Sequence, residues 1–333
     1  MADEAGGRER TDLVARRRLV LVTGRSHPEL AGEVARCLGV PLVGTNLREF
    51  ADGEIHARYE ESIRGADVFI MQTHARPVND SLMEQLIMID AAKRASASRI
   101  TAVCPYYGYS RQDRKARGRE PITAKLVADL LSTAGAGRMM SVDLHSGQIQ
   151  GFFDFPVDHL VASPVLMDYL RREAGSDVVV VSPDAGRVKV AERFSQLLGS
   201  DLAFVHKRRP PGTDNVVEAL EVIGKVAGRR CVVIDDMIDT AGTVCAAAER
   251  LGEEGASEVW AMCTHALLSD PALKRLEAAP LSRVVVTNTL PLPPDRRIDK
   301  LEVLSVAEVI AAAIAAVFED TSVSRIFGGQ NLS

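Results

Sequence analysis

The fold is decided by the stretch Val232-Val233-Ile234-Asp235-Asp236-Met237-Ile238-Asp239-Thr240-Ala241-Gly242-Thr243. Three apolar β-branched residues lead into two adjacent carboxylates, and small and hydroxyl residues follow before the helix-compatible segment 244–251. This order is typical of a buried parallel strand that ends in a tight loop and opens a helix. The stretch therefore predicts a strand–loop–helix unit of a parallel α/β fold.

The same stretch indicates a ligand. Backbone N–H groups at the start of a helix form an anion site, and the hydroxyls of Thr240 and Thr243 add donors. The carboxylates of Asp235 and Asp236 would repel a bare anion, so we assign them to ribose hydroxyls or to a bridging cation. The stretch thus favours a sugar phosphate over a bare phosphate, with an acidic turn and an ordinary helix cap as the structural alternative.

Length and composition bound the classes of function. A chain of 333 residues predicts about two domains. With a net charge of −5 it lacks the electrostatic footprint of a nucleic-acid-binding protein. No apolar run reaches the length of a membrane span. From the charge we expect no nucleic acid as partner, and from the missing span we expect no membrane.

The cysteines and the first residues indicate the compartment. Five cysteines without a Cys-x-x-Cys pair predict buried thiols in a reducing compartment, and we expect a cytoplasmic protein. Residues 1–18 mix acids with arginines and lack the apolar core of a signal peptide, so we expect a disordered tail.

Short apolar runs alternate with amphipathic segments along the chain, which is typical of parallel α/β sheets. The predicted strands are residues 19–22, 68–71, 100–103, 139–142, 178–181, 202–205, 231–234, 259–263 and 284–287. The predicted helices are a first one with Ser26 and Glu29 at capping-box spacing and a stop at Gly39, then residues 81–94, 123–133, 187–198, 242–252 and 306–318. So many strands predict two sheets, divided near residues 161–164, and residues 207–218 have the composition of a loop.

Two further loops carry candidate ligand groups. The loop 50–54 combines an aromatic ring, two acids and a glycine, which could bind a base and a ribose or form an ordinary surface turn. The loop 105–115 follows a predicted strand, and strand ends line the ligand crevices of open α/β sheets. Its Arg111, Arg114 and Lys115 could bind a polyphosphate beside the tyrosines, or the loop could be a solvated one.

Other strand ends carry candidate cation ligands. Asp143 and His145 lie two residues apart after a strand, where side chains of an extended segment point the same way and could hold a divalent cation; a structural histidine is the alternative. Asp184 ends another apolar strand and is a second metal or substrate candidate. Lys207, Arg208 and Arg209 could close on transferring phosphates, or form a solvated basic loop.

Taken together, these motifs closely resemble those of the ribose-phosphate pyrophosphokinases, also called phosphoribosyl diphosphate synthetases, of class I. The loop 235–243 is shared with the wider type I phosphoribosyltransferase fold. The more specific matches are residues 50–54, 77–79, 84–95, 105–117, 119–126, 143–158 and 207–209. The resemblance extends from about residue 19 to residue 327, which leaves out little more than the tail.

The resemblance implies two tandem phosphoribosyltransferase-like domains, each a mainly parallel sheet flanked by helices. They would comprise residues 19–161 on the ATP side and residues 162–328 on the ribose 5-phosphate side, after the tail 1–18. The implied activity is transfer of the diphosphoryl group of MgATP to the 1-hydroxyl of ribose 5-phosphate. The products would be AMP and 5-phospho-α-D-ribose 1-diphosphate, which supplies nucleotide, histidine and tryptophan biosynthesis.

The resemblance also assigns residues to roles. The implied ribose 5-phosphate ligands are Asp235, Asp236, Asp239, Thr240, Ala241, Gly242 and Thr243. The implied ATP ligands are Phe50, Asp52, Gly53, Glu54, Arg111 and Gln112. His145 and Asp184 would place Mg²⁺, and Lys207 and Arg209 would be the catalytic residues that stabilise charge on the diphosphoryl group.

Assembly and regulation are implied as well. Members of the family are generally homohexamers in which a neighbouring chain completes the ATP site, with phosphate as activator and ADP as inhibitor. Two alternatives are a non-catalytic regulatory paralogue, which would lose part of the catalytic set, and a base-salvage phosphoribosyltransferase, which would have one such domain. This chain departs from many relatives at Arg187, where paired glycines are usual, and at Ala51, where a serine or asparagine is usual.

Overall fold

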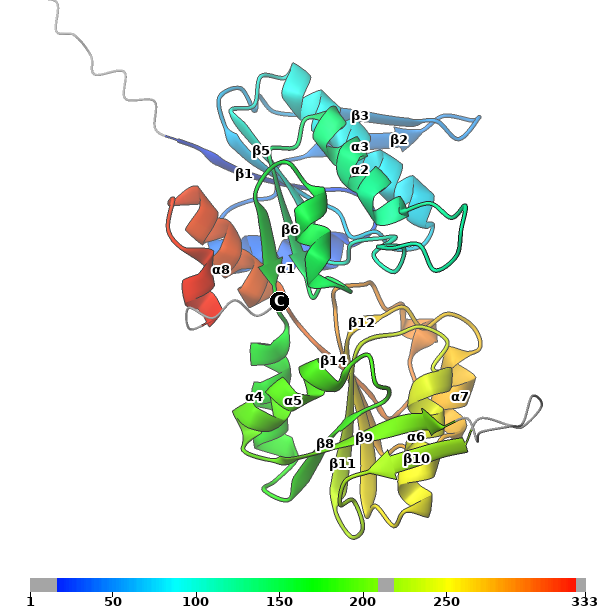
Figure 1. Ribbon diagram of the computed structural model, residues 1–333. Helices are drawn as coiled ribbons and strands as arrows, with labels where there is room; N and C mark the ends of the chain where they lie inside the picture. The colour runs from blue at the N-terminus through cyan, green and yellow to red at the C-terminus, as the bar shows by residue number, and fades with distance from the viewer. Residues whose placement is uncertain (1–16, 209–218, 328–333) are drawn as a thin grey trace, which may run out of the picture.

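The computed structural model describes residues 17–208 and 219–327, in which two parallel sheets flanked by helices lie one above the other (Figure 1). The first sheet has the order β1-β4-β5-β6-β7, and all of its neighbouring strands are parallel. Its strands are β1 Leu19–Thr23, β4 Asp67–Met71, β5 Arg99–Cys104, β6 Arg138–Val142 and β7 Val157–Leu160. The predicted α/β fold class is confirmed.

The second sheet has the order β10-β9-β8-β11-β12-β13-β14 and is parallel except for β10, which runs antiparallel to β9. Its strands are β8 Val178–Ser182, β9 Asp201–Arg208, β10 Ala219–Ile223, β11 Arg230–Ile238, β12 Glu258–Ala266, β13 Arg283–Thr287 and β14 Leu301–Leu304. A separate antiparallel hairpin, β2 Thr45–Glu49 and β3 Ile55–Tyr59, projects beside the first sheet (Figure 1).

Helices connect the strands and cover the faces of both sheets. They are α1 Pro28–Leu38, α2 Val78–Arg94, α3 Thr123–Ala134, α4 Ser163–Glu173, α5 Val188–Leu198, α6 Gly242–Glu253, α7 Ala272–Ala278 and α8 Ala307–Phe318, with 3₁₀ turns at Gly147–Phe152, Pro294–Arg296 and Val323–Phe327. Among the described residues, no helix combines the length and the apolar character that crossing a bilayer would need.

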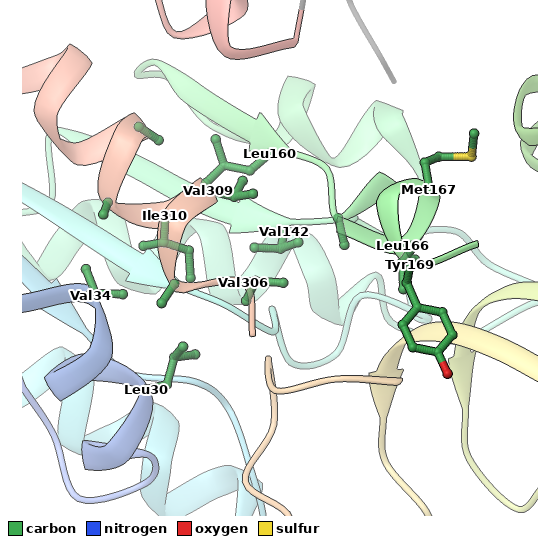
Figure 2. Close-up of a cluster of buried hydrophobic side chains, with 14 of the residues drawn as sticks. Leu30, Val34, Val142, Leu160, Leu166, Met167, Tyr169, Val306, Val309 and Ile310 are labelled. Carbon is green, nitrogen blue, oxygen red and sulfur yellow. The ribbon is translucent and has the colours of Figure 1, made fainter. Parts of the chain in front are cut away.

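The last helix returns to the first sheet. Val309 and Ile310 of α8 are buried in one apolar cluster with Leu30 of α1 and Leu160 of β7 (Figure 2). Ile310 is fully buried, and full burial of such a side chain contributes about 1.5–3 kcal/mol. The C-terminal segment therefore ties the two halves of the chain together.

Several local predictions change. Ser26 does not cap the first helix, because its hydroxyl donates to Gln72 Oε1 at 2.6 Å and His27 occupies the N-cap position. Gly39 does end that helix, in the left-handed conformation. Lys207 was predicted in a loop but lies in β9. The strand extends this far because β10 pairs antiparallel with β9, and Leu220 lies opposite Lys207.

The cysteines and the tail also differ in part from the prediction. Four cysteines are buried free thiols as predicted, whereas Cys37 is exposed. Residues 1–16 of the predicted tail lie outside the described residues. Its last two residues are anchored: Arg17 forms an ion pair with Asp67 at 2.8 Å, and Arg18 donates to a backbone carbonyl.

The carboxyl ends of the two sheets face each other and are joined by hydrogen bonds between buried or half-buried residues. The Thr73 hydroxyl, just after β4, donates to the Thr289 carbonyl at 2.7 Å. The Thr264 hydroxyl of β12 donates to Asp143 Oδ2 at 2.6 Å. Strand ends of this kind line the ligand crevices of α/β proteins, so this junction is where a site is expected.

Candidate functional site

Two cavities lie at the junction of the sheets, and Arg111 lines both. The smaller, of about 580 Å³, is polar and contains the loop 239–243 after β11. The larger, of about 690 Å³, lies between the start of α2 and the loops that follow β12 and β13. The two cavities adjoin at Arg111 and are taken together as the candidate site.

The loop after β11 brings together every residue predicted for the sugar phosphate. All seven, Asp235, Asp236, Asp239, Thr240, Ala241, Gly242 and Thr243, line the smaller cavity. Ala241 adopts the left-handed conformation with φ +60°, which turns the chain sharply into α6. Arg275 braces the turn by donating to the Thr240 carbonyl at 3.0 Å. The first turn of α6 is thus aimed into the cavity, as an anion site requires.

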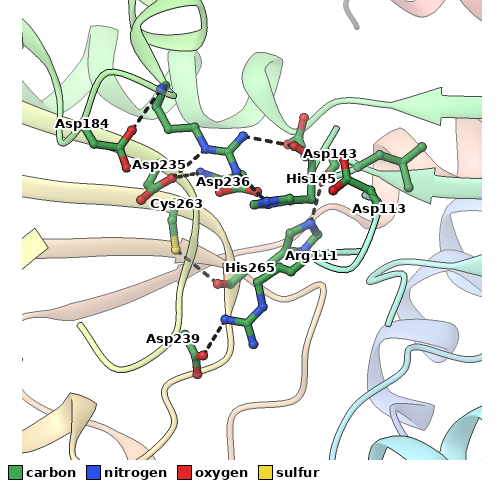
Figure 3. A network of polar contacts seen from close by, with 12 residues as sticks. Arg111, Asp113, Asp143, His145, Asp184, Asp235, Asp236, Asp239, Cys263 and His265 are labelled. Atoms are coloured by element: carbon green, nitrogen blue, oxygen red, sulfur yellow. Dashed lines mark hydrogen bonds and ion pairs between the residues drawn. The ribbon is translucent and has the colours of Figure 1, made fainter. Parts of the chain in front are cut away.

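The paired carboxylates belong to a network that crosses the two halves (Figure 3). Asp236 Oδ2 lies 2.6 Å from Arg187 Nη2 and 2.7 Å from His145 Nδ1. Asp235 Oδ1 lies 3.3 Å from Arg187 Nε and accepts a hydrogen bond from the Asp236 backbone N–H. His145 comes from the first half of the chain, whereas the other three residues come from the second.

Burial and neighbouring charges shift the pKa values of the two carboxylates in opposite directions. Burial, and next the neighbouring Asp236, raise the pKa of Asp235. Burial opposes the charge on Asp236 too, but His145 and Arg187 lower its pKa below the ordinary value. Asp236 is therefore the carboxylate that stays ionised, and Asp235 is the one more easily protonated.

The two predicted metal ligands, His145 and Asp184, line the same cavity. Asp184 Oδ1 accepts from the backbone N–H groups of Gly186 and Arg187, at 2.8 and 3.1 Å. Within residues 17–208 and 219–327, no three His, Cys, Asp or Glu side chains cluster as a metal site by themselves. This donor set fits Mg²⁺, which keeps several waters and takes one or two protein ligands together with substrate phosphates.

Asp143 does not share the orientation predicted for it with His145. Its φ of +39° breaks the extended geometry, so the two side chains diverge. The carboxylate accepts from Thr264 Oγ1 and from the Ala162 backbone N–H at 3.0 Å. Asp143 therefore joins the halves of the chain and does not line either cavity.

Arg111 and Gln112, predicted for ATP, face the larger cavity. Arg111 Nη1 forms an ion pair with Asp239 Oδ2 at 2.7 Å, across the two halves. Burial would raise the pKa of Asp239, but Ser269 and Arg111 lower it below the ordinary value. Gln112 Oε1 accepts from the Thr123 hydroxyl at 2.5 Å.

The other predicted ATP residues lie apart from these cavities. Residues 50–54 form the turn of the β2–β3 hairpin, and none of them lines either cavity. Phe50 is 45% exposed and packs beside Arg48 and His56. Of the two predicted catalytic residues, Lys207 lies near the end of β9 and Arg209 lies outside the described residues.

Sequence reasoning missed several residues of the site. Arg187 was noted as a departure whose side chain could alter the substrate or regulatory pocket, but its contacts with both Asp235 and Asp236 were not predicted. Arg76, Ser269 and Arg296 line the larger cavity and were not singled out. Arg76 Nη2 donates to Ser269 Oγ at 2.5 Å across the two halves, a contact that no local motif indicates.

Two parallel sheets that meet through their carboxyl ends, with an acidic strand–loop–helix turn between them, define an α/β protein of the phosphoribosyltransferase-like class. Residues 19–135 match the family of the N-terminal domain of ribose phosphate pyrophosphokinase, and residues 200–328 match the phosphoribosyl synthetase-associated domain. The chain belongs to the ribose-phosphate pyrophosphokinase family.

Individual relatives cover nearly the whole chain. The ribose-phosphate pyrophosphokinase of Bifidobacterium longum is 57% identical over 93% of this chain and 92% of its own length. That of Streptomyces coelicolor is 55% identical over 94% of this chain and 97% of its own length. The crystal structure of phosphoribosylpyrophosphate synthetase from Mycobacterium smegmatis superimposes with a TM-score of 0.87 at 52% identity, over 91% of this chain and 100% of that one.

Proposed function

We propose that this chain transfers the diphosphoryl group of MgATP to the 1-hydroxyl of ribose 5-phosphate. The sugar oxygen bonds to the β-phosphorus of ATP and gives up its proton, while the bond from the β-phosphorus to the α–β bridging oxygen breaks. The products are AMP and 5-phospho-α-D-ribose 1-diphosphate. The observation that carries the proposal is the gathering of the whole 235–243 loop, His145, Asp184 and Arg111 around one cavity.

The smaller cavity takes the sugar phosphate in this proposal. The 5-phosphate lies at the start of α6, where the backbone N–H groups and the hydroxyls of Thr240 and Thr243 can donate to it. The ribose hydroxyls donate to the carboxylates of Asp235 and Asp236. This arrangement leaves the 1-hydroxyl free to face the nucleotide.

ATP lies along the side of the site that Arg111 and Gln112 line. Arg111 borders both cavities, so its guanidinium can hold phosphates between the two substrates. His145 and Asp184 hold Mg²⁺, which neutralises charge on the transferred group when it is bound. Lys207 and Arg209 stabilise the same charge in the transition state, where most of the catalysis of phosphoryl transfer arises.

Phe50, Asp52, Gly53 and Glu54 contact ATP bound to another copy of the chain. The hairpin that carries them projects beside the first sheet, and its turn residues line neither cavity of their own chain (Figure 1). The exposed Phe50 ring is suited to stacking on a base once a neighbour brings one to it. A homohexamer supplies such neighbours.

We divide the chain into an ATP-side domain of residues 19–161 and a sugar-side domain of residues 162–328, with α8 packed back on the first. We place the enzyme in the cytoplasm, with phosphate as activator and ADP as inhibitor.

AMP release tests the proposed activity. Purified protein with free phosphate is expected to release AMP from ATP, and the release is expected to require both ribose 5-phosphate and Mg²⁺. A base-salvage enzyme or a regulatory paralogue would release none. Absence of AMP under these conditions would overturn the proposal.

A further inference from the structure

A guanidinium occupies the centre of the sugar side of the site. Arg187, the residue that precedes α5, contacts Asp235 Oδ1 at 3.3 Å and Asp236 Oδ2 at 2.6 Å. It also contacts His145 at Nδ1, 2.7 Å away, and donates to the carbonyl of that residue at 3.2 Å. Its side chain is only 16% exposed, so this is an enclosed position and not a surface pair.

The paired carboxylates need a countercharge at this point. The side chains of Asp235 and Asp236 are 18% and 8% exposed, and neighbouring buried carboxylates disfavour each other's ionisation. His145 Nδ1 can donate to Asp236 or accept from Arg187, but one ring nitrogen cannot do both at once. The guanidinium keeps its charge in either case, so Arg187 is the permanent countercharge of the pair.

A divalent cation that bridged the paired carboxylates to a sugar would have to contact the oxygens that Arg187 contacts. A bound cation and the Arg187 guanidinium would compete for the same oxygens of Asp235 and Asp236. Because the Arg187 side chain is part of the protein and cannot dissociate as a metal ion does, it occupies this position at any concentration of free metal. A guanidinium can, in addition, orient two carboxylates at once through its fork of donors.

We propose that Arg187 is a tethered counter-cation that makes ribose 5-phosphate binding independent of free divalent cation. This inference rests on the proposed function for the identity of the sugar phosphate. Arg187 acts as a positioning residue: it neutralises Asp235 and Asp236 and fixes their orientation toward the ribose hydroxyls. The Mg²⁺ that accompanies ATP at His145 and Asp184 is a separate requirement.

The test measures ribose 5-phosphate binding by titration calorimetry, without ATP, in EDTA and in excess Mg²⁺. The wild-type protein is expected to bind equally well in both. Arg187→Gly is expected to bind about tenfold more weakly in EDTA, the equivalent of about 1.4 kcal/mol, and to recover in Mg²⁺. Arg187→Lys should retain most of the metal-independent binding. Lys189→Ala, which removes an exposed charge two residues along the chain, should match the wild type.

A loss of affinity in Arg187→Gly that Mg²⁺ does not restore would overturn the proposal, as would no loss at all. A second measurement does not depend on the sugar: electron paramagnetic resonance counts bound Mn²⁺ in protein without substrates. Arg187→Gly and Arg187→Ala are each expected to bind an additional Mn²⁺ ion relative to the wild type, and equal counts would also overturn the proposal. If the wild type binds no ribose 5-phosphate, the proposed function fails, and the Mn²⁺ count still decides the role of Arg187.

Discussion

Replacement of Asp236 by asparagine tests the sugar side of the site most directly. Asp236 is 8% exposed, and one of its oxygens contacts both Arg187 and His145. Asparagine keeps the shape of the side chain and removes its charge. The change therefore separates the charge of the carboxylate from its packing.

The size of the effect follows from the hydrogen bonds concerned. A hydrogen bond to a charged group contributes about 1.5–3 kcal/mol, and a neutral one about 0.5–1.5 kcal/mol. Loss of the charge at a single ribose hydroxyl is thus expected to cost about 1–2 kcal/mol, which is roughly a fivefold to thirtyfold loss of affinity. ATP does not contact this carboxylate in the proposed arrangement, so its affinity should hardly change.

Separate calorimetric titrations of ribose 5-phosphate and of ATP measure the two affinities. Asp113→Asn is the matched control, because Asp113 lines the same cavity but accepts from Gln148 at 3.3 Å and lies outside the carboxylate pair. The control should bind ribose 5-phosphate as the wild type does. Equal weakening of both ligands in Asp236→Asn, or unchanged sugar binding, would refute the assignment of the loop to the sugar.

Three further predictions concern other parts of the molecule. Lys207→Ala should lower kcat by about 10²–10³-fold with little change in KM, because the proposed contact forms in the transition state. Steady-state kinetics in which KM rises and kcat stays normal would contradict this role. Burial lowers the pKa of His74 to about 4 from 6.5, so the unfolded state binds more protons between these values and stability falls as the pH drops through this range. In denaturant unfolding, the wild type should lose about 2 kcal/mol more stability between neutral pH and about pH 5 than His74→Asn does, since His27, His159 and His265 add their own losses in both proteins; equal losses would rule out this source. Phe50→Ala and Arg111→Ala should each be nearly inactive in AMP release, and co-expression of the two should restore part of the activity in mixed oligomers; no restoration would mean that the two residues do not come from different chains.

The strands predicted from sequence are those with apolar residues on both faces. Val178–Ser182 is buried at every position, so its sequence is a continuous apolar run. The missed strands lie at sheet edges or in the separate hairpin. Val157–Leu160 and Leu301–Leu304 each border one neighbour and tolerate charged residues such as Asp158 and Glu302, which hide the strand pattern.

The missed β2–β3 hairpin has a different cause. Its first strand, Thr45–Glu49, is half-buried or exposed at every position and carries polar side chains. Its identity depends on pairing with Ile55–Tyr59, which no local apolar pattern specifies. Loop 50–54 was therefore predicted as a possible ligand loop, but not as the turn of a projecting ribbon.

Within the candidate site, residues that belong to a single loop could be grouped from their order along the chain alone. Residues 235–243 follow one another along the chain, so their chemistry can be predicted from their order. Arg187 and His145 lie 42 positions apart and meet only because β8 and β6 belong to sheets that face each other. Contacts of this kind depend on the tertiary fold, so the sequence indicated that Arg187 could alter a pocket but not which residues it contacts.

The contacts between the sheets determine what the site can do. Arg111 with Asp239, and His145 with Asp236, each connect two segments that belong to different halves. Thr73 with Thr289, and Asp143 with Thr264, fix the separation of those halves through hydrogen bonds, the first buried and the second half-buried. A change that shifts one sheet against the other would disturb both contacts together. The alignment of a sugar oxygen with a phosphorus atom therefore depends on buried residues that touch neither substrate, and Thr264 and Thr73 belong to the site as much as the loop that lines it.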